Sequence, residues 1–201
     1  MKWLISGLVA LVLSVGSASA LNRAYLDDMR QATVEVQTKD GGHGSGVVIS
    51  SFEVLSATHM GRVGDKVLVV FNDGTTRKGT FSKVLGDTDT SLIVLSVPEA
   101  VKPAEVACRE PLIAEPITVI GSPMFLHWVV TLGIVASVHP DELLPETFTM
   151  LDVTGNPGNS GGPVFDDEGK VLGTVTASLS AYGERSDLLA MTKAAAFCKF
   201  L

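Results

Sequence analysis

From Ala32 onward the chain consists of short apolar or alternating segments that are separated by turn residues. Residues 33–38 alternate polar and apolar side chains, which is typical of a half-buried strand. Similar strand-like segments are 46–49, 53–56, 66–71, 75–83, 92–97, 117–120, 127–138, 147–153, 164–165, 171–177 and 187–191. Short strands at this spacing predict an all-β barrel or sandwich rather than alternating strands and helices.

The segments between these strands predict how the chain is divided. Residues 72–74 read Asn-Asp-Gly, a hairpin signal. Residues 97–116 hold four prolines and predict a connection between two halves. We therefore expect one half at about 32–97, a connection at about 98–116 and a second half at about 117–191. Residues 22–31 predict a short amphipathic helix or arm, and a terminal helix is expected at 192–201.

The first twenty residues have the pattern of a secretory signal peptide. Lys2 precedes the apolar run Trp3–Val15, and Ala18-Ser19-Ala20 supplies the small residues that a signal peptidase reads. Cleavage there leaves a mature chain that starts at Leu21 and is secreted or periplasmic. The alternative is an uncleaved membrane anchor, for which the apolar run is short.

Charge and cysteine content narrow the function classes. Without Lys2 the chain carries 14 basic and 22 acidic residues, a net charge of −8. An acidic chain argues against a nucleic-acid partner. The two cysteines, Cys108 and Cys198, are too few for a metal site, and no His-x-x-x-His pattern accompanies them. No metal or cofactor is expected, and the oligomeric state is not predicted.

Two candidate catalytic residues follow from local patterns. Ser160 lies within Gly155–Pro163, which reads Gly-Asn-Pro-Gly-Asn-Ser-Gly-Gly-Pro. Glycines allow the sharp turn on which a nucleophilic serine must stand, with N–H groups aimed at a developing oxyanion. His59 lies about 100 residues before Ser160, after an apolar strand and the small residues Ser56 and Ala57. Taken alone, each pattern also fits an ordinary turn or an ordinary histidine.

Taken together and in order, these motifs resemble the trypsin-like serine proteases, and in particular the bacterial HtrA (Deg-type) branch. The resemblance covers nearly all of residues 32–200. The segments that carry it are Gly44–Ile49, Leu55–His59, Gly121–Pro123, Val130–Val135, Gly158–Pro163 and Gly169–Thr174.

The resemblance implies two packed six-stranded antiparallel β-barrels, with the active site in the cleft between them. It implies a serine endopeptidase that acts on protein or peptide substrates through an acyl-enzyme intermediate. Ser160 would be the nucleophile and His59 the general base, and the N–H groups of Gly158 and Ser160 would form the oxyanion hole. The alternative is a catalytically impaired binding protein on the same scaffold. HtrA proteins usually carry PDZ domains after the protease, and none is expected within these 201 residues.

The third member of the triad has two possible positions. The family pattern of an acid followed by apolar, small and aliphatic residues fits Asp89, with Ser91 at the small position. A shift by two residues instead puts Ser91 at the acid position. A shift by one is excluded because it would turn the side chain to the opposite face of the strand. We predict Asp89 and assign no role to the nearby Asp87.

The family alignment also implies a specificity pocket and a disulfide. Thr154 would form the base of the pocket, with walls from Gly155, Thr176, Ala177 and Ser178. A base without a carboxylate predicts a small or medium aliphatic side chain at the P1 position of the substrate. In this fold the terminal helix packs near the connection, so Cys108 and Cys198 are expected to pair, the alternative being two separate thiols. No role is predicted for His43, His127 or His139.

Overall fold

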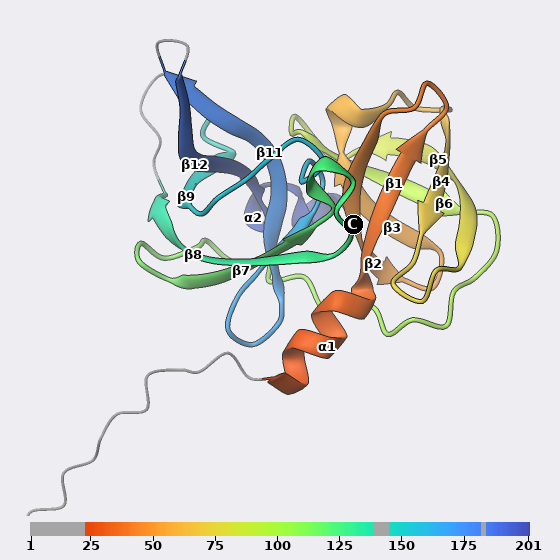
Figure 1. Ribbon diagram of the computed structural model, residues 1–201, viewed down its shortest axis with the longest axis horizontal. Helices are drawn as coiled ribbons and strands as arrows, with labels where there is room; N and C mark the ends of the chain where they lie inside the picture. The colour runs from red at the N-terminus through yellow and green to blue at the C-terminus, as the bar shows by residue number, and fades with distance from the viewer. Residues whose placement is uncertain (1–22, 139–144, 182–183) are drawn as a thin grey trace, which may run out of the picture.

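The computed structural model describes residues 23–138, 145–181 and 184–201, which form two β-barrels side by side (Figure 1). The strands are β1 (Thr33–Thr38), β2 (His43–Ser50), β3 (Glu53–Ala57), β4 (Lys66–Val70), β5 (Thr76–Val84), β6 (Thr90–Leu95), β7 (Pro116–Gly121), β8 (Val129–Ser137), β9 (Phe148–Asp152), β10 (Pro163–Phe165), β11 (Val171–Ala181) and β12 (Glu184–Lys193). The helices are α1 (Arg23–Ala32) and α2 (Ala194–Phe197), and three 3₁₀ turns are η1 (Thr58–Met60), η2 (Pro123–Phe125) and η3 (Cys198–Phe200).

Barrel 1 contains the first six strands in the order β1-β2-β3-β6-β5-β4 and closes through the antiparallel pair of β1 with β4. Its interior is filled by branched and aromatic side chains from both sides of the barrel, Val34, Val36, Val69, Phe81 and Ile93 among them. The predicted alternation along β1 is present, but Thr33 and Glu35 are buried too, because residues of barrel 2 contact the outer face of this part of the strand.

Barrel 2 repeats this architecture in the order β10-β11-β12-β9-β8-β7 and closes through the pairing of β10 with β7. Its separate core includes Val119, Val135, Leu151, Leu172 and Leu189. The prediction of two closed six-stranded antiparallel barrels is therefore confirmed.

A third apolar cluster joins the barrels. Leu55 and Leu92 of barrel 1 belong to the same cluster as Phe165 of barrel 2 and Phe197 of α2. A buried pair of hydroxyl groups, Thr90 Oγ1 and Thr174 Oγ1, lies 2.7 Å apart across the same interface. Because apolar burial dominates folding energetics, this cluster holds the two halves of the cleft in a fixed relation.

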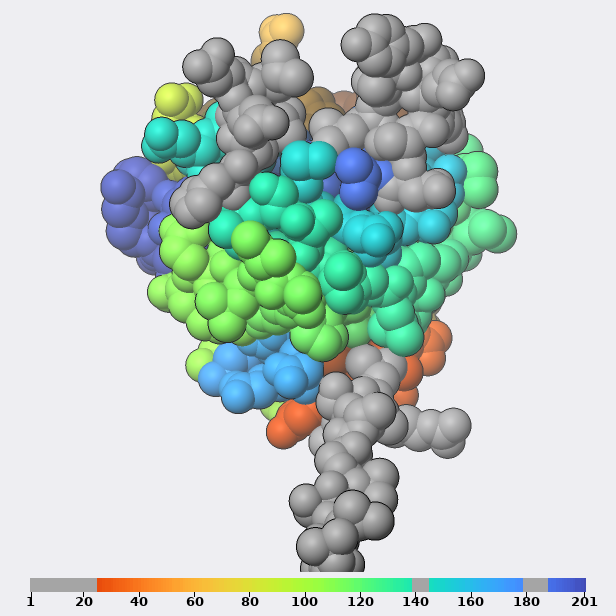
Figure 2. All heavy atoms as spheres, turned by 90° about the vertical axis from the view of Figure 1, so that its left-hand side faces the viewer, coloured from red at the N-terminus to blue at the C-terminus, as the bar shows by residue number. Residues whose placement is uncertain are grey.

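The two ends of the described chain cross over between the barrels. The segment before barrel 1 contacts barrel 2, and the segment after barrel 2 contacts barrel 1. Helix α1 precedes barrel 1, yet a Cβ at Gly169, in the turn between β10 and β11, would lie 3.3 Å from Tyr25. Figure 2 shows this turn (light blue) at the foot of barrel 2 beside the orange helix. The segment after barrel 2 instead reaches barrel 1, where Lys83 Nζ donates to the carbonyl oxygen of Phe200 at 2.6 Å.

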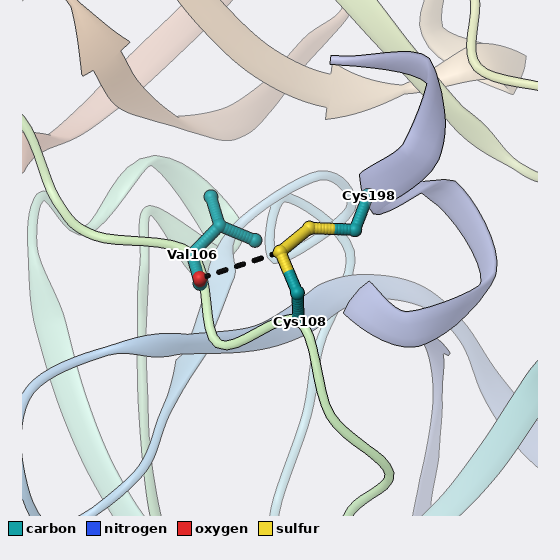
Figure 3. Close-up of a disulfide and its surroundings, with 3 residues drawn as sticks. All are labelled: Val106, Cys108 and Cys198. Atoms are coloured by element: carbon teal, nitrogen blue, oxygen red, sulfur yellow. Dashed lines mark hydrogen bonds between the residues drawn. A yellow bond between two sulfur atoms is a disulfide. The ribbon is translucent and has the colours of Figure 1, made fainter.

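The predicted disulfide is present and ties the connection to this terminal segment (Figure 3). The Cα atoms of Cys108 and Cys198 lie 5.7 Å apart. The terminal helix begins at Ala194 rather than at Thr192, because Thr192 and Lys193 still pair with β11. Within the described ranges, no helix has the length and apolar character needed to span a membrane. The predicted signal peptide lies outside the described residues.

Candidate active site

His59 and Asp89 meet at the edge of barrel 1 that faces barrel 2. The β3–β6 ladder ends with the pair Ala57 and Thr90, so the residues just beyond it on each strand are neighbours. His59 Nδ1 donates to Asp89 Oδ2 at 2.8 Å, and the His59 backbone N–H donates to Asp89 Oδ1 at 3.0 Å. The carboxylate therefore fixes both the ring orientation and the tautomer of His59, and it leaves Nε2 available as a base.

This carboxylate also changes the proton affinity of the histidine. The hydrogen bond to Asp89 raises the pKa of His59 above its usual range, and the negative charge acts in the same direction. Partial burial opposes the increase. Asp89 thus stabilises the imidazolium form of His59 relative to a histidine without this partner, and imidazolium is the species that forms when a general base takes a proton.

Ser91 makes a different contact. Its side chain is 2% exposed, and its hydroxyl group lies 2.8 Å from that of Thr58. The two-residue shift considered for the acid position would require this hydroxyl at the imidazole. Of the two candidates, Asp89 is the one that is hydrogen-bonded to the His59 ring.

Ser160 stands on a tight turn between two glycines with left-handed backbone. Gly158 has φ +106° and Gly161 has φ +80°, values that side chains rarely allow. The Gly161 N–H donates to the Val175 carbonyl at 2.7 Å and so ties the turn to β11. A Cβ at Gly161 would lie 2.5 Å from the backbone nitrogen of Ala57. The serine turn is therefore packed directly against the strand that leads to His59.

The peptide before Gly158 is oriented by a loop of barrel 2. The Pro157 carbonyl accepts a hydrogen bond from the Met124 N–H at 2.8 Å. In a trans peptide the following N–H points the opposite way, so the Gly158 N–H is directed away from Met124. The expected role of Gly158 in an oxyanion hole would use this N–H.

Ser45 of barrel 1 holds the same turn from the other side. Its hydroxyl group donates to the Gly158 carbonyl at 2.7 Å and accepts from the Ser122 N–H at 2.9 Å. Its own N–H donates to the Ser160 carbonyl at 2.8 Å. Next to it, a Cβ on Gly44 would lie 2.9 Å from the same Ser160 carbonyl oxygen, so the close approach of β2 requires glycine there.

The arrangement of these residues agrees with a match between the sequence and a known protein family. The trypsin-like peptidase domain matches residues 12–173, a range that includes His59, Asp89 and Ser160. The chain belongs to the trypsin-like peptidase family.

Relatives of this peptidase domain belong to the HtrA branch that the motifs predicted. A probable periplasmic serine endoprotease DegP-like from Halomonas elongata is 36% identical over 137 residues, which cover 65% of this chain and 28% of the relative. A putative serine protease HhoB from Synechocystis is 34% identical over 151 residues, with coverage of 69% and 35%. The chain thus spans only about a third of the length of these curated relatives.

Solved structures of the same branch have the same fold. An HtrA-type protease AlgW with tripeptide superposes with a TM-score of 0.79 at 21% identity, covering 88% of this chain and 61% of that one. A serine endoprotease from Yersinia pestis gives a TM-score of 0.75 at 21% identity, with coverage of 88% and 64%. At this level of identity the likeness establishes the fold of the peptidase domain alone.

The residues predicted for the specificity pocket differ in their surroundings. Thr154, Ala177 and Ser178 are exposed, whereas Thr176 is buried and its hydroxyl group lies 2.8 Å from that of Thr192. Gly155 lies against Leu189, the strand partner of Ser178. A separate cavity of about 460 Å³ opens beside His59, and its described lining comes entirely from barrel 1.

His43, to which the sequence assigned no role, lies at the serine turn. Its Nε2 is 3.1 Å from the Ser122 carbonyl oxygen, and a Cβ at Gly158 would lie 2.6 Å from this nitrogen. The only sequence signal was its position immediately before the Gly-Ser-Gly motif.

His127 also has a polar partner, since its Nδ1 donates to the buried Glu35 carboxylate at 2.7 Å. His139 lies outside the described residues.

Proposed function

We propose that the protein is a serine endopeptidase that hydrolyses peptide bonds through Ser160, His59 and Asp89. The observation that carries the proposal is the bond from His59 Nδ1 to Asp89, at the edge of the strand against which the serine turn is packed. The naming of curated relatives as serine endoproteases supports it.

Each residue has a defined task in this reaction. Ser160 attacks the scissile carbonyl while His59 Nε2 takes its proton, and His59 later returns the proton to the leaving amine. Asp89 stabilises the imidazolium that forms in between, in line with the raised pKa of His59. The N–H groups of Gly158 and Ser160 stabilise the oxyanion of the tetrahedral intermediate. The collapse of that intermediate leaves an acyl-enzyme, which water hydrolyses.

The alternative of an impaired binding protein depended on the uncertain acid position. The two hydrogen bonds between His59 and Asp89 argue against this alternative.

The decisive experiment compares wild type with Ser160→Ala. We expect kcat to fall by roughly 10⁶-fold while the fold is retained, with the remaining rate still about 10³–10⁴ above that in water. A fluorophosphonate should label the wild type and leave the variant unlabelled. Labelling of Ser160→Ala at the wild-type rate would refute the assignment.

We further propose that the substrate side chain at P1 is small or medium and aliphatic. Thr154 at the expected base of the pocket is uncharged, and the neighbouring Gly155 has no side chain. Cleavage of a peptide library should favour alanine or valine at P1. A profile dominated by arginine or lysine would contradict this pocket.

The protein is proposed to act outside the cytoplasm after removal of residues 1–20. The disulfide between Cys108 and Cys198 fits an oxidising compartment, and several relatives are named as periplasmic. N-terminal sequencing of the exported protein should begin at Leu21. An N-terminus at Met1 would show that the segment is retained.

A further inference from the structure

His43 touches both segments that shape the oxyanion hole. It is the first residue of β2, and its ring stacks on Phe125 of η2, with centroids 3.9 Å apart and planes inclined by 21°. Its Nε2 lies 3.1 Å from the Ser122 carbonyl oxygen and 3.3 Å from the Phe125 backbone nitrogen. The same nitrogen lies against Gly158, where a Cβ would be 2.6 Å away.

The two backbone contacts require opposite roles of the ring nitrogen. The Phe125 N–H can only donate, so it needs Nε2 without a proton, whereas the Ser122 carbonyl can only accept and needs Nε2 with one. In either tautomer His43 therefore binds one end of the segment 122–125. Between these two ends lies Met124, whose N–H holds the Pro157 carbonyl.

The segment held by His43 has an unfavourable backbone. Met124 has φ +50° and Phe125 has φ +64°, left-handed values for residues that carry side chains. Such conformations persist only where the surroundings impose them. Both residues are largely exposed, at 57% and 64%, so burial in the protein interior does not hold their backbone. The ring and nitrogen of His43 supply a contact on the inner side.

We propose that His43 is a positioning residue of the oxyanion hole. It holds segment 122–125 so that Met124 keeps the Pro157 carbonyl turned away and the Gly158 N–H stays directed at the developing oxyanion. His43 itself contacts neither the substrate nor the reacting atoms. The inference rests on the proposed function, because it concerns how the proposed oxyanion donors are held.

The test uses His43→Leu in the purified protein with a peptide anilide that carries valine at P1. This variant removes the ring nitrogens and keeps an apolar side chain. We expect kcat to fall by about ten- to a hundredfold with KM within about twofold, because oxyanion donors act in the transition state. The affinity for a peptide boronate of the same sequence should fall by the same factor, since its tetrahedral adduct uses those donors. The affinity for the product peptide should not change.

His43→Gln tests whether a polar side chain restores the activity that His43→Leu loses. It also keeps the proposal testable if His43→Leu folds poorly. The terminal amide of glutamine offers both a donor and an acceptor near the position of Nε2, so most of kcat and of boronate affinity should return. Ser50→Ala is the control on the same strand, because its hydroxyl group bonds to Glu53 at the far end of β2 and should not affect turnover.

Three results would overturn the inference. Wild-type kcat in His43→Leu would remove the positioning role. A raised KM with unchanged kcat would mean that the side chain contacts the substrate. Equal losses in His43→Leu and His43→Gln would assign the effect to the ring stack alone. Failure of the proposed function is distinguishable, because wild type itself would then lack turnover that Ser160→Ala abolishes.

Discussion

The two barrels support their parts of the candidate site in different ways. In barrel 1, His59 and Asp89 meet because β3 and β6 are paired strands, so the base and its carboxylate are held by one local ladder. In barrel 2, the turn that carries Ser160 is bonded to β11 of its own barrel but also to Ser45 of barrel 1. The base–acid pair is thus local to one barrel, whereas the nucleophile turn depends on both.

This difference separates two kinds of damage. A change at Asp89 should alter chemistry without affecting how the barrels pack, because the side chain serves one neighbour. A change at Ser45 should alter stability and chemistry together, because the same hydroxyl group joins the barrels and supports the turn. The following predictions test that distinction, from the largest effect on turnover to the smallest.

Asp89→Asn should reduce kcat by about 10³–10⁴ while KM and the free energy of unfolding stay nearly unchanged. The amide can no longer hold the reactive tautomer of His59 or stabilise its imidazolium. Steady-state kinetics and urea unfolding measure the two quantities. Asp87→Asn is the matched control, since Asp87 is exposed and lies two residues away, and it should behave like wild type. Near-wild-type turnover of Asp89→Asn would place the acid elsewhere or indicate a Ser–His dyad.

Ser45→Ala should reduce kcat by about ten- to a hundredfold, less than the loss of an oxyanion donor itself. It should also lower the free energy of unfolding by about 1–3 kcal/mol, because the buried Ser122 N–H and Gly158 carbonyl lose their partner. Kinetics and denaturant unfolding of the same samples measure both effects. Ser50→Ala, on the same strand, is the control. A stable variant with wild-type kcat would show that barrel 1 does not support the turn.

The activity should fall on the acid side as His59 becomes protonated, about tenfold per pH unit for a single ionisation. Because Asp89 raises the pKa of His59, Asp89→Asn should move this acid limb to lower pH, in addition to lowering the maximal activity.

The free energy of unfolding should depend on pH in the opposite direction. A raised folded-state pKa contributes stability below the unfolded pKa of the histidine, and this contribution is lost as pH rises through the folded value. An acid limb at the same pH in both proteins would mean that another group governs it.

Reduction of the Cys108–Cys198 disulfide should leave kcat within about twofold while lowering the free energy of unfolding. The bond closes a loop with a sequence separation of 90, for which the chain-entropy model gives about 4–5 kcal/mol. Urea unfolding with and without reductant measures this difference, and the Cys108→Ser, Cys198→Ser double variant is the control. Two free thiols titrated in unfolded, unreduced protein would contradict the pairing.

The strands were predictable where local patterning decides them. The prediction for β1 matched both of its ends, and the hairpin at residues 72–74 is a turn in which Gly74 has φ +82°. Strand β8 begins at Val129 rather than at His127, because Trp128 has φ +50° and its Nε1 donates to the Thr33 carbonyl of barrel 1. Local sequence cannot reveal a contact with a strand almost a hundred residues away.

The candidate site was predictable to a similar extent. The motifs around His59 and Ser160 are local, so the resemblance identified them, but the choice between Asp89 and Ser91 depended on the register of β6 against β3. That register pairs Ser91 with Ser56 and leaves Asp89 beyond the ladder. The contacts of His43 arise only when segment 122–125 packs onto barrel 1, so its position before the Gly-Ser-Gly motif could not identify its partners.

The contacts between each barrel and the far end of the described chain also determine when the candidate site can form during synthesis. The strands of barrel 1 are complete once Leu95 has been made, yet the apolar cluster that includes Leu55 and Leu92 also requires Phe197 of α2. The serine turn likewise has no Ser45 to hold it until both barrels have met. A growing chain therefore carries its histidine and carboxylate long before it can carry a supported nucleophile. Under the proposed function, activity is therefore expected only after barrel 2 and α2 have been made and have packed against barrel 1.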